Sequence, residues 1–393
     1  MRLRIKTTNK LLEPVIMLLS FFLGFEEGGF QLILLSIANE FELSNASMGS
    51  LVSVQYAAII IAPLMFRNFA DKVGKKIITV LFAMVFIVGC FTIIWTLSII
   101  VVIIGIFILG CGFSVCESSV IAALADSYGI RSGKYINISQ SFFSVGAVVS
   151  PLITNFGMVY LGVDWRVVFA ISGCGYLFLM IPLLFTKFAI DIPIQSLSDY
   201  RRFTTFSMIL FPTFLCLLVT ILIYVSMENG LTFFLDSMFI KVLDAPKLAA
   251  FSISLFWLAM VPSRLLASLF NRHQITLLIF CFFGSTVLLI ILALNSSPYI
   301  SLAICFALGL FFGPIWPTAM SIATQEFPSN SGRVTSLMLS FSGVGGAFSP
   351  IVMGSLADVV SFKASYLSLS LFAIVGLTMI LVYIKMKKSR FRK

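Results

Sequence analysis

Apolar segments of about 20 residues recur along the whole chain, with only short polar stretches between them. A helix of roughly 20 residues is what the hydrocarbon core of a bilayer requires. We count twelve such segments, with approximate limits 13–38, 47–66, 76–95, 98–125, 135–161, 166–187, 206–239, 247–270, 274–294, 299–325, 333–358 and 362–385. They are continuously apolar, whereas the strands of a membrane barrel alternate with a period of two. The pattern predicts an all-α integral membrane protein with twelve transmembrane helices.

The composition excludes most other classes of protein. Of the 393 residues, 60% are hydrophobic and 11% are charged, against roughly 45–50% and 25% in soluble domains. This excludes a soluble enzyme, a nucleic-acid-binding domain and a disordered chain. The seven cysteines lie in apolar segments without a CxxC pair, so we expect neither disulfides nor a thiolate metal site. No phosphate-binding loop or nucleophile motif is present, and we expect no enzymatic activity and no cofactor.

Basic residues are distributed unevenly between the two sides of the predicted membrane domain. Of the 26 lysines and arginines, four fall in or beside the loops opposite the chain ends, namely Arg166, Lys241, Lys247 and Lys363. Cytoplasmic loops carry the excess of basic residues. We therefore expect both termini in the cytoplasm. The short loops and the lack of a targeting extension further suggest the inner membrane of a bacterium.

The two halves of the chain repeat each other. At a constant offset of 199 residues, the matched pairs are Gly133 with Gly332, Ser141 with Ser340, Gly146 with Gly345, Pro151 with Pro350, and Pro63 with Pro262. Glu27 matches Glu228 at an offset of 201. We predict two six-helix bundles, 1–187 and 206–393, joined by a cytoplasmic loop, 188–205. Parallel repeats of this kind occur in secondary transporters, with the substrate site between the halves at mid-membrane.

Acidic residues inside the apolar segments are the first candidates for function. A charge at the centre of a membrane helix costs about 2.5–3.5 kcal/mol on insertion scales. Glu117 lies deepest, and we predict that it takes up the coupling proton. Glu27 and Glu26 are further candidates for proton coupling. They are adjacent and point about 100° apart, so we expect only one to line a cavity, and the repeat favours Glu27 with Glu228. The alternatives are a protonated glutamate bonded to a neighbouring helix, or an acid solvated at a helix end.

Amides and tryptophans form a second candidate set. Amides offer both donors and acceptors, which suits a hydroxyl-rich neutral ligand, and an indole face can stack on a sugar ring. Trp316 also occupies the position in the second half that Glu117 has in the first. The predicted substrate-binding residues, with Glu228, are Gln31, Asn137, Gln140, Asn229, Trp257 and Trp316. Bonds between helices and packing against lipid are the alternative roles for these side chains.

Charged residues near the loop ends are candidate gates. Acid and base within reach of each other can pair in one conformation and separate in another. We predict such gating for the loop residues Asp71, Lys72, Lys75 and Lys76, and for two acids, Asp126 and Glu326, paired with Arg131 and Arg333. The alternative is simple anchoring of the topology.

The run from Asp71 to Lys76 resembles the loop between the second and third helices of the major facilitator superfamily, with Arg67 in place of the leading glycine of that motif. The resemblance covers essentially the whole chain and implies alternating access by rocking of two bundles. Since the sequence contains no metal-binding cluster and its composition excludes a nucleic-acid-binding domain, we expect neither partner. A two-bundle carrier can work as a monomer in the bilayer.

A narrower resemblance is to the fucose permease branch of proton-coupled sugar symporters. It is carried by Gly110 to Glu117, Asn137 to Ala147, Tyr224 to Glu228, Phe256-Trp257 with Arg264, and Gly313 to Pro317. In that branch a fourth-helix glutamate and a first-helix aspartate serve proton coupling and sugar recognition. Glu117 matches the glutamate, whereas Gln31 stands where the aspartate is expected.

The sequence therefore favours a secondary transporter that moves a small solute, most plausibly a sugar, by proton symport. The driving ion is H⁺ in this interpretation, and Na⁺ is not excluded. A proton-coupled antiporter that exports a drug-like or cationic compound is the main alternative, because phenylalanine, methionine and buried acids suit such a cargo. A sensor or lipid-handling protein on the same scaffold is a third possibility.

Overall fold

The computed structural model describes residues 11–43, 45–188, 208–270 and 272–390. Within these ranges the secondary structure is helical, as predicted. The first half contains α1 (Leu12–Glu40), α2 (Asn45–Val73), α3 (Lys75–Ile94), α4 (Ile99–Tyr128), η1 (Gly129–Arg131), α5 (Ser132–Tyr160) and α6 (Val167–Phe185). The predicted linker 188–205 lies, beyond Phe188, outside the described residues, so the domain limits stay a prediction.

The second half repeats this order with two interruptions. It contains α8 (Pro212–Thr232), α9 (Leu235–Lys241), α10 (Pro246–Ala267), α11 (Gln274–Leu294), α12 (Pro298–Phe312), α13 (Ile315–Glu326), η2 (Pro328–Asn330), α14 (Ser331–Val359) and α15 (Phe362–Arg390). The predicted segment 206–239 thus becomes α8 followed by α9, and the segment 299–325 becomes α12 followed by α13.

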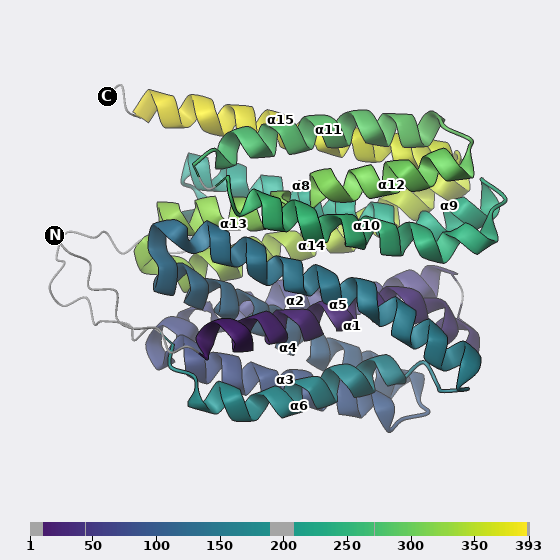
Figure 1. Cartoon of the computed structure of the whole chain (residues 1–393), viewed down its shortest axis with the longest axis horizontal. Helices are drawn as coiled ribbons and strands as arrows, with labels where there is room; N and C mark the ends of the chain where they lie inside the picture. The colour runs from purple at the N-terminus through teal and green to yellow at the C-terminus, as the bar shows by residue number, and fades with distance from the viewer. Residues whose placement is uncertain (1–10, 44, 189–207, 271, 391–393) are drawn as a thin grey trace, which may run out of the picture.

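The helices run side by side along the long axis, and the two halves form two layers of the molecule (Figure 1). In the described residues, nine stretches are long and apolar enough to cross a membrane, and two shorter apolar helices accompany them. One of the nine stretches, Ile99–Tyr160, contains both α4 and α5. The prediction of an all-α membrane fold is confirmed, and these stretches are consistent with twelve crossings.

The start of α1 and the end of α15 lie at the same end of the molecule, called here the terminal end (Figure 1). Large apolar side chains are exposed around the bundle, including Trp95, Phe178, Phe185 and Ile351. A soluble monomer rarely exposes so much apolar surface, and lipid is the solvent that suits it. Helices satisfy their own backbone groups, which lipid cannot do.

Glycine contacts confirm the internal repeat in three dimensions. A Cβ atom on Gly29 would meet Ser150 Oγ, and one on Gly230 would meet Ser349 Oγ. The carbonyl of Phe21 likewise blocks a Cβ on Gly146, as the carbonyl of Leu222 does for Gly345. The first helix of each half therefore packs against the fifth through equivalent close approaches.

The residues of α2 correspond to those of its repeat partner α10 at a different offset from the one predicted. Gly110 of α4 packs on Gln55 and Ala58. Its repeat partner Gly309 packs on Phe256 and Ala259, which are 201 residues further along the chain. The offset of 199 that matched Pro63 with Pro262 is therefore wrong for this helix pair, and Tyr56 corresponds to Trp257.

Candidate functional site

Glu26 and Glu27 occupy different surroundings on α1. Glu26 is 1% exposed, and its carboxylate accepts hydrogen bonds from Gln55 Nε2 at 3.2 and 3.4 Å. It also interacts electrostatically with Cys90 of α3, so it faces the interior of the first bundle. Glu27 accepts hydrogen bonds from Gln31 at 3.3 Å and from Tyr56 at 3.5 Å. The angle of about 100° between neighbouring helix positions accounts for this separation.

Glu27 faces the second half of the protein. Glu228 of α8 acts electrostatically on Glu27 across the two halves. Glu228 itself is half-buried and accepts a hydrogen bond of 2.5 Å from the hydroxyl group of Tyr224. The two repeat-related glutamates thus lie near each other between the bundles, each with a tyrosine partner from its own half.

A direct polar contact joins the halves beside these acids. Trp257 Nε1 of α10 donates to Gln31 Oε1 of α1 at 3.2 Å. Trp257 also lies 6.1 Å, between ring centroids, from Phe143 of α5. The contact brings together two residues that the sequence predicted independently as substrate-binding, one from each half.

Glu117 has an amide partner from the neighbouring helix. Gln140 Nε2 of α5 donates to Glu117 Oε1 of α4 at 3.4 Å. Glu117 is half-buried although it lies mid-helix, and Glu27, Glu228 and Arg264 all act on it electrostatically. The geometry brings the predicted proton-coupling acid into the same group as the predicted substrate residues.

The remaining predicted binding residues are buried close to this group or on the helices that build it. Asn137 Nδ2 donates to Gly133 O of its own helix at 2.8 Å, whereas its Oδ1 has no hydrogen-bond partner among the described residues. Asn229 is also buried, and its side chain lies beside the hydroxyl-bearing ring of Tyr56. A Cβ on Gly346 of α14 would meet both Asn229 and Tyr56, so these two side chains flank the same point. Trp316 is buried in the first turn of α13.

Arg264 and Tyr56 also lie in this candidate site, and the sequence analysis did not predict them. Arg264 is 2% exposed and bonds to both halves, through Gly313 O at 3.0 Å and through Gln140 O and Ser144 Oγ at 2.7 Å each. An arginine in the apolar segment 247–270 was a usable signal, because a charge at that depth needs partners. Tyr56 gave no such signal, because a tyrosine in an apolar helix is ordinary.

Charged residues at the terminal end close one side of this group. Lys75 pairs with Asp126 of the first half and donates to Ser331 Oγ of the second at 2.8 Å. Ser331 in turn donates to Asp126 Oδ1 at 2.6 Å. Lys76 lies apart from this cluster and donates to Leu184 O at 2.5 Å within its own half.

The described ion pairs of the two predicted gate acids involve lysines in this conformation, where we expected arginines. Asp126 pairs with Lys75, and Glu326 lies 3.7 Å from Lys387 Nζ. Arg131 is exposed in η1, and Arg333 lies on the first turn of α14. The side chains of Asp71 and Lys72 lie outside those that the structure describes.

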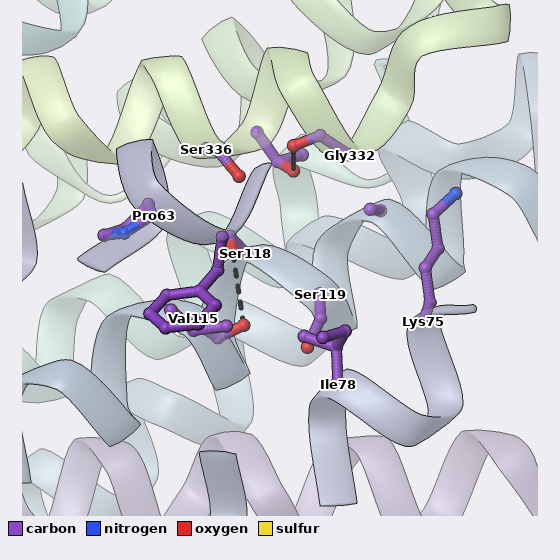
Figure 2. Close-up of a pocket in the computed structure, with 11 residues that line it drawn as sticks. Pro63, Lys75, Ile78, Val115, Ser118, Ser119, Gly332 and Ser336 are labelled. Carbon is purple, nitrogen blue, oxygen red and sulfur yellow. Dashed lines mark hydrogen bonds between the residues drawn. The ribbon is translucent and has the colours of Figure 1, made fainter. Parts of the chain in front are cut away.

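A small cavity of about 10 Å³ lies beside the terminal cluster, between α2, α3, α4 and α14. Figure 2 shows Lys75, Ser118 and Ser119 on one side of it and Gly332 and Ser336 of α14 on the other. This is about the space that one water molecule needs. In this conformation the cavity has no room for a sugar, and the halves are packed together here.

Curated proteins of similar sequence include sugar transporters. The chain is 28% identical over 134 residues to a glucose/mannose transporter of Bacillus subtilis, which covers 34% of this chain and 33% of that protein. It is 24% identical over 251 residues to a glucose/galactose transporter of Brucella abortus, covering 59% of each. The matches thus span from a third to about three fifths of the length of these relatives.

The fold has close counterparts among solved structures. The crystal structure of the Escherichia coli fucose:proton symporter superposes with a TM-score of 0.77, at 15% sequence identity, over 95% of this chain and 99% of that one. At this identity the likeness shows the shared fold. The family model of the Major Facilitator Superfamily matches residues 16–335 and 269–392. This match covers most of the chain, and the protein therefore belongs to the Major Facilitator Superfamily.

Proposed function

We propose that this protein is a secondary transporter that moves a sugar together with a proton. The observation that carries the proposal is the pair formed by Glu117 and Gln140, which lies between the halves beside Glu27, Glu228 and Arg264. An acid in that position can bind a proton where both it and the substrate are shielded from bulk water. The sugar-transporting relatives support the same cargo.

The proposed cycle assigns a role to each group of residues. Protonation of Glu117 neutralises it, which lowers the cost of enclosing the site when the bundles rock. The amides of Gln31, Asn137, Gln140 and Asn229 contact hydroxyl groups of the sugar. Asn137 Oδ1 supports this role, because a buried amide atom without a partner is costly unless a ligand pairs with it.

Tyr56, Trp257 and Trp316 provide ring faces beside these amides. We further propose that Glu27 and Glu228 bind the sugar or a proton between the halves, and that Glu26 acts as a proton site inside the first bundle. Lys75, Asp126 and Ser331 form the gate at the terminal end. We place this end in the cytoplasm of a bacterial cell, with the protein acting as a monomer in the inner membrane and with H⁺ as the driving ion.

Uptake into proteoliposomes tests the proposal. Labelled hexoses, 6-deoxyhexoses and amino sugars are offered under an inward proton gradient, under an inward sodium gradient, and without a gradient. We expect one sugar to accumulate with the proton gradient and to be lost when a protonophore is added. Accumulation with sodium alone contradicts the proton coupling. If no sugar accumulates and organic cations leave the vesicles as protons enter down their gradient, the antiporter alternative replaces the symporter.

A further inference from the structure

Arg264 has an unusual partner on its own half of the protein. Its Nε donates to the carbonyl of Gly313 at 3.0 Å. In a continuous helix, that carbonyl accepts a bond from the N–H of residue 317. Residue 317 is a proline and has no N–H. The arginine therefore satisfies a carbonyl that the sequence of α13 leaves without its helical partner.

The interruption between α12 and α13 brings Gly313 close to α10. A Cβ atom on Gly313 would collide with Ser263 Oγ and lie 3.2 Å from the Cα of Met260. The glycine thus allows α10 to approach the break closely enough for Arg264 to reach it. One end of the guanidinium is fixed to the second half in this way.

The other end of the guanidinium is fixed to the first half. One of its terminal nitrogens donates to Gln140 O and to Ser144 Oγ, each at 2.7 Å. Gln140 lies nine residues into α5, and Arg264 lies three residues before the end of α10, so both are nearer the terminal end of their helices. Hydrogen bonds from a charged donor are about twice as strong as neutral ones. Arg264 therefore ties the halves together on that side.

Gln140 connects this tie to the proton site. Its backbone carbonyl accepts from Arg264, while its side chain donates to Glu117 at 3.4 Å. Among the described residues, Glu117 of α4 and Glu228 of α8 interact electrostatically with Arg264. Rocking that opens the terminal end must break the bonds to α5, which moves the positive charge relative to both acids.

We propose that Arg264 is a positioning residue that latches the two halves together on the terminal side and links that closure to the Glu117–Gln140 pair. The anchor is the carbonyl of Gly313 that Pro317 leaves unpaired, and the latch is the pair of bonds to Gln140 and Ser144. The inference rests on the proposed rocking of the halves and is independent of the identity of the cargo.

Distance measurements between spin labels test the latch. Labels at Ile130 and Leu269, exposed at the terminal end of the two halves, report its opening, in a background in which Cys111 and Cys174 are alanine. In the wild type we expect mainly short distances. R264M should raise the ratio of long to short distances about tenfold, which corresponds to about 1.4 kcal/mol. S144A should raise it less, because it removes one of the two bonds across the halves.

Pro317→Ala distinguishes a latch between the halves from a role of Arg264 that is limited to stabilising the break between α12 and α13. Alanine restores an N–H for the Gly313 carbonyl, so R264M/P317A should regain the melting temperature that R264M loses. The long distances should persist in the double variant, because the bonds to α5 are still missing. If the double variant regains wild-type distances, Arg264 only caps the helix break and the proposal is wrong.

R272M is the matched control, because Arg272 is an exposed arginine of the same half. It should leave the distances unchanged. Where R264M does not fold, S144A decides alone, and unchanged distances in S144A overturn the latch. The distance measurement needs no substrate. If the protein moves no sugar but its variants change the label distances as expected, the proposal of a sugar substrate is wrong and the latch is still supported.

Discussion

Lys75, at the start of α3, donates a hydrogen bond of 2.8 Å to Ser331, at the start of α14, although 256 residues separate them in the chain. Asp126 completes the cluster by pairing with Lys75 and accepting from Ser331. Two of these side chains belong to the first half and one to the second. The two halves are therefore joined at the terminal end by a polar contact.

Lys75→Met should weaken that contact. The variant keeps the apolar length of the side chain but removes the amine, which leaves Asp126 without its ion-pair partner. We expect a several-fold increase in labelling of a cysteine at Ser336, which lines the cavity beside the cluster, by a maleimide applied from the terminal side. Lys76→Met is the control, because Lys76 bonds within its own half. Equal labelling of both variants contradicts a gating role for Lys75.

Glu117→Gln should abolish proton-driven accumulation. The amide cannot exchange a proton, so we expect accumulation to fall at least tenfold, to the level seen without a gradient. Exchange of external labelled sugar for internal unlabelled sugar should continue, because the neutral amide resembles the protonated acid. Glu13→Gln is the control at an exposed acid, whose carboxylate accepts from Tyr128. Undiminished proton flux with the sugar in Glu117→Gln would refute the coupling role.

Trp257→Phe should weaken sugar binding more than it weakens the fold. Phenylalanine keeps a ring near Phe143 but loses the N–H that donates to Gln31. We expect the KM for uptake to rise several-fold while the melting temperature shifts little. Trp95→Phe is the control, since Trp95 is 83% exposed on the outside of the bundle. A changed KM in both variants, or in neither, argues against a substrate contact at Trp257.

Gly28→Ala should destabilise the first half. A Cβ atom on Gly28 would collide with the backbone of Ala147 on α5, and helices packed on backbone atoms cannot relax cheaply. We expect a loss of about 1–3 kcal/mol, measured as a lower melting temperature in detergent. Gly354→Ala is the control, because a Cβ there meets only Phe234 at an ordinary distance of 3.5 Å. A melting temperature unchanged by Gly28→Ala would show that α1 and α5 have room to separate.

Acidification should loosen the end of the molecule opposite the terminal end. Arg166 bonds to Glu40 at 2.7 Å, and this bond holds the pKa of Glu40 below its usual value. A lowered pKa in the folded state gives stability that is present above the usual pKa of about 4.3 and is lost as the pH falls through the folded value. The melting temperature of the wild type should therefore fall more between pH 7 and pH 3 than that of Glu40→Gln. Parallel losses would assign the acid sensitivity to other groups.

Several site residues were predictable because their signals are local. Glu117 and Gln31 are a charge and an amide in apolar segments, and the cost of burying such groups in lipid selects them without any structure. Trp257 was a candidate because an indole face can stack on a sugar ring. The internal repeat then related Glu27 to Glu228. Arg264 carries the same kind of signal, because it is a charged residue within the apolar segment 247–270.

Other features depend on contacts that no single segment contains. Glu26 faces the interior of the first bundle because Gln55 of α2 and Cys90 of α3 lie beside it, and neither is near Glu26 in the sequence. The ion-pair partner of Asp126 is Lys75 because α3 and α4 are neighbours at the terminal end, although Arg131 is closer to Asp126 in sequence.

Segment length and composition were enough to predict the all-α membrane fold, because burial in lipid acts on each segment separately. The tertiary structure decided which side chains meet between the halves. Arg264 reaches Gly313, Gln140 and Ser144 from three different helices. Such hydrogen bonds require donor and acceptor within about 3 Å, and only the packing of distant segments sets distances on that scale.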